Sequence, residues 1–153
     1  MSFQCTCGHP GIGCYCSSTA DLRIEHGRVT RVDEQPAVDL INHPPHYNLH
    51  PSGIECIEVT RLCTYTCGNA IKYVWRTDLK NGKQDLEKAI WYLEDAVRHA
   101  DPVFLPGKYA EALDKLHRVM QYESDHNRLE FFGAMAIGAK HRAIESVRKL
   151  LAA

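Results

Sequence analysis

Hydrophobic residues recur three and four positions apart over most of the second half of the chain, which is the period of an amphipathic helix. The clearest case covers residues 84–99. The same spacing predicts a helix that begins near Ile54, a helix over residues 69–79 that ends at Asn81-Gly82, and two helices between residues 108 and 153. The pattern therefore predicts a mainly α fold.

The first of these helices carries a capping signal. Ser52 precedes the apolar positions, and Glu55 follows three residues later, which is the spacing of a capping box. We therefore expect Ser52 to be the N-cap residue. Glu55 and Glu58 also lie three residues apart on this helix, so they could instead hold Mg²⁺ beside a phosphate.

Two irregular features come before the helices. Residues 22–32 alternate apolar and polar side chains around His26-Gly27, which predicts a short β-hairpin. The segment INHPPHYNLHPSG, residues 41–53, follows as a proline-rich loop that contains His46, Tyr47 and Asn48. A loop held by prolines and dense in polar side chains is typical of a binding site.

The cysteines gather at the start of the chain, where Cys5, Cys7, Cys14 and Cys16 form two C-x-C pairs. Four thiolates could close a structural zinc site, although this spacing is tighter than the usual one. The alternative is a segment of reduced thiols. We divide the chain into a cysteine-rich segment 1–18, a hairpin and linker 19–41, a helical domain 42–100 and a helical extension 101–153.

Charge and hydropathy limit the partners. The chain of 153 residues has 18 basic and 19 acidic side chains, and this balance argues against a general nucleic-acid binder. No apolar run reaches the roughly 20 residues of a membrane span, and the start does not resemble a signal peptide. We expect a cytoplasmic protein with no membrane partner.

Three cations, Lys72, Arg76 and Lys80, are spaced four residues apart, so a continuous helix would place them on one face. Lys83 follows just after the Asn-Gly turn. Free amide N–H groups at a helix start attract anions, and phosphate is the obvious ligand for such a cluster. The alternative is a solvated surface whose cations pair with neighbouring acids, namely Asp78, Asp85, Glu87 and Glu94.

Aromatic residues surround these cations. We expect Trp75 and Trp91 to be core residues rather than base-stacking platforms, whereas Tyr73 and Tyr92 could present a ring to a ligand. The chain contains no G-x-x-x-x-G-K-[ST] loop, so any nucleotide chemistry would proceed without a Walker motif.

Four segments, HPPHYN, GIECIEV, GNAIKYVWR and KNGKQDLEKAIWYLE, resemble a short domain shared by many small bacteriophage proteins. That family includes the T7-type phage nucleotide kinase, which phosphorylates deoxynucleoside monophosphates without a Walker motif. The resemblance covers about residues 42–97. It implies phosphoryl transfer from a nucleoside triphosphate to a deoxynucleoside monophosphate in the host cell cytoplasm, with Mg²⁺ as cofactor.

The resemblance also implies roles for particular residues. Catalysis would fall to Lys72, Arg76 and His46, and Mg²⁺ to Glu55 and Asp85. The remaining candidates of the resemblance would bind substrate: Tyr47, Asn48, Asn69 and Lys80. Lys83, a candidate from its position near the start of the next helix, would bind substrate with them. At Asp78 many relatives have a small residue or glycine, and an acid there would weaken the cationic cluster.

Two other functions stay open from the sequence. An all-α, Mg²⁺-dependent pyrophosphohydrolase would pair carboxylates on adjacent helices, and Glu55 and Glu58 with Glu94 and Asp95 loosely imitate that arrangement. The second is a non-catalytic module that binds a nucleotide or a host protein. In either case, small residues along the last helix favour close packing with another copy, so we expect a homo-oligomer.

Overall fold

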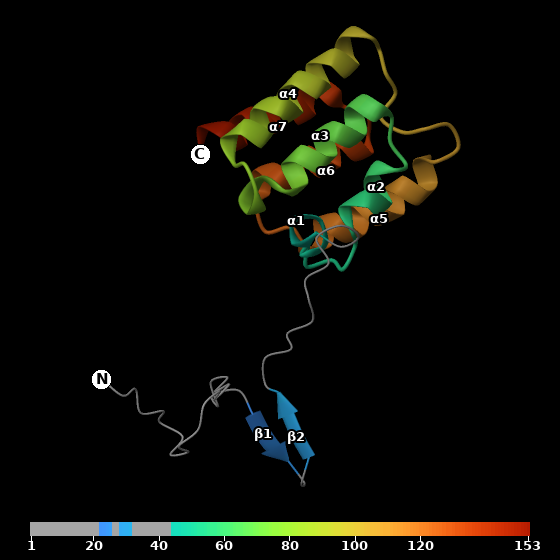
Figure 1. Cartoon of the computed structure of the whole chain (residues 1–153). Helices are drawn as coiled ribbons and strands as arrows, with labels where there is room; N and C mark the ends of the chain where they lie inside the picture. The colour runs from blue at the N-terminus through green and yellow to red at the C-terminus, as the bar shows by residue number, and fades with distance from the viewer. Residues whose placement is uncertain (1–21, 26–27, 32–43) are drawn as a thin grey trace, which may run out of the picture. The chain divides into compact units, whose positions relative to one another are not determined.

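The computed structural model describes residues 22–25, 28–31 and 44–153 (Figure 1). The chain divides into two compact units, residues 1–37 and 38–153. In the first unit, β1 (Leu22–Glu25) pairs antiparallel with β2 (Arg28–Arg31), with Leu22 opposite Arg31. This is the hairpin that the alternating pattern predicts. The predicted zinc ligands Cys5, Cys7, Cys14 and Cys16 lie outside the described residues.

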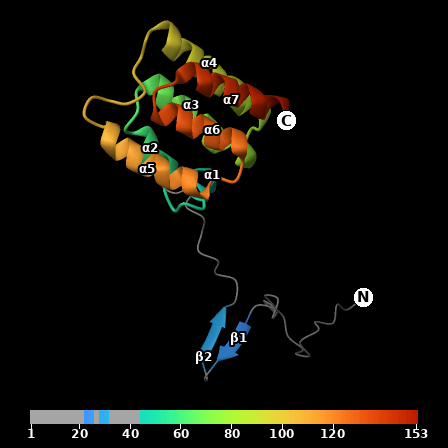
Figure 2. The same cartoon turned by 180° about the vertical axis from the view of Figure 1, so that it is seen from behind.

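The second unit is helical, as the apolar spacing predicts. Helices α2, α3 and α4 form one layer, and α5, α6 and α7 form a second layer behind it (Figures 1 and 2). The elements are α1 (Pro45–Asn48), α2 (Cys56–Thr60), α3 (Tyr65–Trp75), the 3₁₀ helix η2 (Thr77–Leu79), α4 (Lys83–Arg98), α5 (Tyr109–Tyr122), α6 (His126–Ala136) and α7 (Lys140–Ala152). Within the described residues, no helix is long and apolar enough to cross a membrane.

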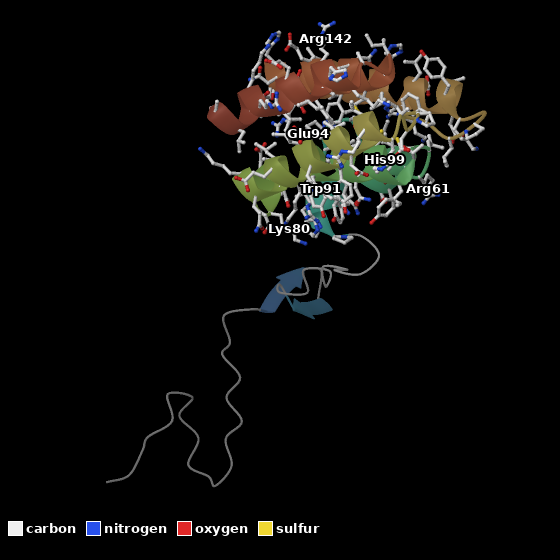
Figure 3. The ribbon with its side chains drawn as sticks, turned by 90° about the horizontal axis from the view of Figure 1, so that it is seen from above. Arg61, Lys80, Trp91, Glu94, His99 and Arg142 are labelled. Carbon is white, nitrogen blue, oxygen red and sulfur yellow. The ribbon has the colours of Figure 1, made fainter. Side chains whose placement is uncertain are left out.

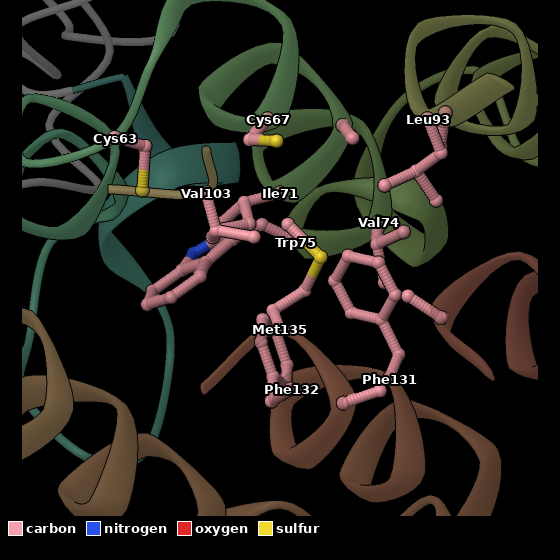
Figure 4. Packing of buried hydrophobic residues seen from close by; sticks show 14 of the residues in the cluster. Cys63, Cys67, Ile71, Val74, Trp75, Leu93, Val103, Phe131, Phe132 and Met135 are labelled. Carbon is pink, nitrogen blue, oxygen red and sulfur yellow. The ribbon is translucent and has the colours of Figure 1, made fainter. Parts of the chain in front are cut away.

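One hydrophobic core joins the two layers (Figure 4). Val74 of α3 and Leu93 of α4 are fully buried in the same cluster as Phe131 of α6. The ring of Trp75 meets that of Phe132 edge-on, with centroids 5.9 Å apart. The segments 42–100 and 101–153 therefore share their core and pack as a single unit.

The two tryptophans have different environments. Trp75 is buried, as predicted, but Trp91 is 60 % exposed on the outer surface of α4, so its assignment to the core was wrong. The apolar face of α4 consists of Leu86, Ala89 and Leu93, and Trp91 lies off that face. The three described cysteines, at positions 56, 63 and 67, are buried free thiols inside the helical unit.

Several helix ends differ from the prediction. The N-cap of α2 is Glu55 rather than Ser52, and the Glu58 carboxylate accepts a hydrogen bond from the backbone N–H of Glu55 at 3.0 Å. The hydroxyl of Ser52 instead accepts from the N–H of Ile54. The segment expected to form one last helix is two helices, because the chain turns at Gly138, whose φ of 75° suits glycine.

Candidate functional site

A pocket of about 260 Å³ opens beside α1 and α2, and it brings together residues from three of the four sequence motifs. Tyr47 and Asn48 come from α1, Glu55 from the start of α2 and Lys72 from α3. Thr60, which the sequence did not single out, also lines it. Four predicted site residues therefore lie around one cavity.

Lys72 is the half-buried cation of this pocket. Its ammonium donates a hydrogen bond to Asn69 Oδ1 at 2.6 Å and lies 4.6 Å from the centre of the Tyr73 ring. Within residues 44–153, no carboxylate is within ion-pair distance of Lys72. Burial lowers the pKa of Lys72, and the neighbouring charge of Arg76 lowers it further. The ammonium would therefore gain stabilisation from any anion that enters the pocket.

Beneath Lys72, Arg76 and Asp85 form a buried ion pair. Arg76 Nε donates to one Asp85 oxygen at 2.8 Å, and its Nη2 donates to the other at 3.1 Å. The remaining arm of the guanidinium donates to the hydroxyl of Tyr47 at 2.5 Å. Burial opposes ionisation of Asp85, but its hydrogen bonds with Arg76 hold the pKa of the carboxyl below its ordinary value. Arg76 thus fixes the position of Tyr47 at the pocket.

The local chain path explains this pairing. Helix α3 ends at Trp75, and Arg76 is its C-cap residue, so the prediction of one continuous helical face through Lys72, Arg76 and Lys80 was wrong. A 3₁₀ turn follows, and Gly82 adopts a φ of 52° before α4 begins. This reversal returns Asp85, in the first turn of α4, to Arg76.

The cations still act on one another, although they do not share a helix face. Burial lowers the pKa of His46, and the charges of Lys80 and Arg76 add to that effect. The His46 ring lies 4.3 Å from the ring of Tyr47. By contrast, Lys83 is exposed at the first residue of α4, and no described contact joins it to the pocket.

The two predicted Mg²⁺ ligands differ in their fit. Asp85 is fully buried, and its oxygens are occupied by Arg76, by Asn81 at 3.4 Å and by Lys88 at 3.6 Å, so it does not suit a metal ion. Glu55 lines the pocket and could contact a metal that enters with a phosphate. Across the described part of the chain, no three His, Cys, Asp or Glu side chains cluster as a metal site.

Three of the four carboxylates that a pyrophosphohydrolase would use are engaged in ion pairs. Glu58 pairs with Lys115 of α5 at 2.8 Å, and its pKa is lowered chiefly by that hydrogen bond. Glu94 pairs with Arg148 at 3.0 Å, and Asp95 pairs with Arg98 at 3.2 Å. Glu58 is thus tied to α5 and Glu94 to α7.

A second cluster anchors the loop between α1 and α2. The ring of His50 lies 4.9 Å from that of Trp75, and its Nδ1 is 2.8 Å from the hydroxyl of Ser52. His50 Nε2 is 3.9 Å from a Glu123 oxygen, just after α5. Arg128 of α6 approaches Glu123 at 3.2 Å and also pairs with Asp78. This cluster was not predicted from the sequence, because its members are far apart along the chain.

The site lies within the part of the chain that matches a known family. Residues 41–94 match the model of a family described as a protein of unknown function, DUF3310. No curated protein and no solved structure matches the chain. The matched segment contains the whole pocket and the Arg76–Asp85 pair, whereas α5, α6 and α7 lie beyond it. The segment that carries the candidate site is therefore similar in sequence to a family of unknown function. The helices that complete the hydrophobic core of the helical unit lie outside the matched residues.

Proposed function

We propose that the pocket beside Lys72 binds the phosphate of a nucleotide, and that the protein is a nucleotide kinase. It would transfer a phosphoryl group from a nucleoside triphosphate to a deoxynucleoside monophosphate. The observation that carries this proposal is the half-buried ammonium of Lys72, which has no carboxylate partner in the described structure and borders a cavity lined by Tyr47 and Asn48. Burying a cation without a counter-charge lowers the stability of the folded protein, and an anion bound in the pocket would offset that loss.

The chemistry suits a site of this kind, because catalysis of phosphoryl transfer consists mostly of positioning and charge neutralisation. Lys72 would hold a phosphate directly, and Lys80 would add its charge from the neighbouring turn. Tyr47, fixed by Arg76, and Asn48 would orient the sugar or base. In this arrangement Arg76 supports the site, since its planar fork already binds Asp85.

Mg²⁺ would supply neutralisation of the charge on the triphosphate, and Glu55 is the carboxylate at the pocket that could contact it. The four motifs resemble a phage domain family that includes the T7-type nucleotide kinase, and residues of three of them line the pocket, so the resemblance supports the same function.

The proposal is tested by incubating the purified protein with ATP, Mg²⁺ and each deoxynucleoside monophosphate in turn, and separating the products by anion-exchange chromatography. We expect a diphosphate from at least one monophosphate, and at least a tenfold lower rate with Lys72→Met. Lys108→Met is the matched control, because Lys108 is an exposed lysine paired with Glu111 outside the pocket. No diphosphate from any monophosphate would contradict the kinase. Release of pyrophosphate without an acceptor would identify a hydrolase instead.

A further inference from the structure

Four aromatic rings form a continuous strip on the outer surface of α3 and α4. Tyr73 stacks on Tyr92 with centroids 5.8 Å apart and planes inclined by 21°. Trp91 and Tyr65 each meet Tyr92 edge-on, at 4.9 Å and 6.1 Å. Tyr65 is 76 % exposed and Trp91 is 60 % exposed. Together these residues, Tyr65, Tyr73, Trp91 and Tyr92, are called the aromatic strip.

The strip begins beside Lys72, the cation that lines the pocket. Lys72, Arg76 and Lys88 lie 4.6, 4.8 and 5.5 Å from the centre of the Tyr73 ring. Figure 3 shows Lys80 and Trp91 on the layer that contains α3 and α4, away from Arg142 of α7. Cations and exposed rings therefore lie on one layer of the helical unit.

We infer that the aromatic strip binds single-stranded nucleic acid, with bases stacked on Trp91 and Tyr65 and backbone phosphates at Lys72 and Lys88. Non-specific single-strand binders combine these two elements, a cationic track and aromatic side chains on which bases stack. The inference rests on the proposed function in one respect, because Lys72 binds phosphate both in the proposed nucleotide site and in the proposed oligonucleotide site.

Two of the three acids of α4 that border Trp91 are paired with cations. Glu94 is paired with Arg148, and Asp95 is paired with Arg98. Glu87, one helical turn before Trp91, is exposed and belongs to none of the ion pairs among the described residues, so its charge opposes a polyanion at this point. The nearly balanced charge of the whole chain predicts that oligonucleotide binding is modest. Because only two lysines contact phosphates, the affinity should fall gradually as salt is added.

A second copy of the chain fits the strip less well. In a two-fold contact the same surface faces itself, so a dimer centred on the strip would bring Lys72 and Lys88 of one subunit towards the same cations of the other. Apposed like charges oppose such a contact, whereas a polynucleotide supplies the phosphates that they attract.

The two tryptophans provide a direct readout. Trp75 is buried and Trp91 is exposed, so quenching of the fluorescence on addition of a ligand to the surface reports on Trp91. We expect a twelve-nucleotide oligothymidylate at low salt to quench this fluorescence and to bind at least tenfold more tightly than thymidine monophosphate.

The variants are measured by anisotropy of a labelled oligothymidylate, since Trp91→Ala removes the reporter. Trp91→Ala and Tyr65→Ala should each weaken oligonucleotide binding about five- to hundredfold, leaving the melting temperature and mononucleotide binding unchanged. Tyr109→Ala is the matched control, because Tyr109 is a half-exposed tyrosine on α5, outside the strip. It should bind like the wild type.

Three results would overturn the inference: an oligonucleotide bound no more tightly than the mononucleotide, full affinity in both strip variants, or self-association lost in Trp91→Ala without oligonucleotide binding. Mononucleotide binding without oligonucleotide binding would overturn the inference and leave the proposed function standing. Strip-dependent oligonucleotide binding in a protein that forms no diphosphate would support the inference and contradict the kinase.

Discussion

Arg76 and Asp85 form an ion pair that is almost entirely shielded from water, with Arg76 8 % exposed and Asp85 fully buried. The pair joins the end of α3 to the first turn of α4 and holds Tyr47 at the pocket. Its residues were predicted from the sequence as a phosphate ligand and a metal ligand. A pairing of the clustered cations with Asp85 was the alternative interpretation of the sequence, but as a solvated surface contact. Its burial was not predicted, because the helix was expected to continue through Arg76.

Replacing Arg76 by lysine should therefore destabilise the fold as well as weaken the site. An ammonium cannot span both oxygens of Asp85 and also reach the Tyr47 hydroxyl, since it lacks the planar fork. We expect Arg76→Lys to lower the free energy of unfolding by about 1–3 kcal/mol, measured by urea denaturation. An unchanged denaturation midpoint would contradict the buried pairing.

Asp85 should also make stability depend on pH. Because its pKa is lower in the folded protein than its ordinary value of 3.8, its contribution is complete above that value and is lost as the pH falls through the folded pKa. Asp85→Asn leaves the guanidinium buried without a counter-charge and should cost about 3–5 kcal/mol near pH 7. Urea denaturation at decreasing pH should show this difference between wild type and variant shrinking below about pH 4. A difference that is constant with pH would contradict the assignment.

At the scale of elements, the helix with the most regular apolar spacing was predicted best. The helix expected over residues 84–99 is α4, Lys83–Arg98, because its apolar face is regular and a glycine precedes it. The end of α3 and the break at Gly138 were missed, since helical spacing continues across both and only the tertiary packing decides where the chain turns. Trp91 was misplaced because a large aromatic residue was assumed to be buried.

The loop between α1 and α2 contacts a helix outside the family match. His50 contacts Trp75 of α3 and Glu123, the C-cap residue of α5, so these two helices hold the loop that follows Tyr47 and Asn48 of α1. His50 does not line the pocket, so His50→Ala should weaken nucleotide binding several-fold only by releasing the loop. Calorimetric titration would measure this loss of affinity. His117→Ala is the control, because His117 is exposed on α5. Equal affinity in His50→Ala would show that the loop needs no anchor.

At the scale of the whole molecule, the shared core sets the smallest folding unit. Val74 and Leu93 pack in one cluster with Phe131, Met135 and Val147, so residues 38–100 alone would expose a large apolar surface. We expect that fragment to show no cooperative thermal transition by circular dichroism. Residues 38–153 should melt cooperatively, because that unit contains the whole described core. A cooperative transition in the shorter fragment would contradict the shared core.

The central claim is that Lys72 binds a nucleotide phosphate, and calorimetric titration of the wild type and Lys72→Met with deoxynucleoside monophosphates tests it most directly. We predict saturable binding of at least one monophosphate by the wild type. Loss of one charge-assisted hydrogen bond should make binding by Lys72→Met about ten- to hundredfold weaker. The melting temperature of the variant should be equal or higher, because an apolar side chain replaces a half-buried cation without a carboxylate partner among the described residues. Equal affinity in the two proteins, or no binding by the wild type, would contradict the claim.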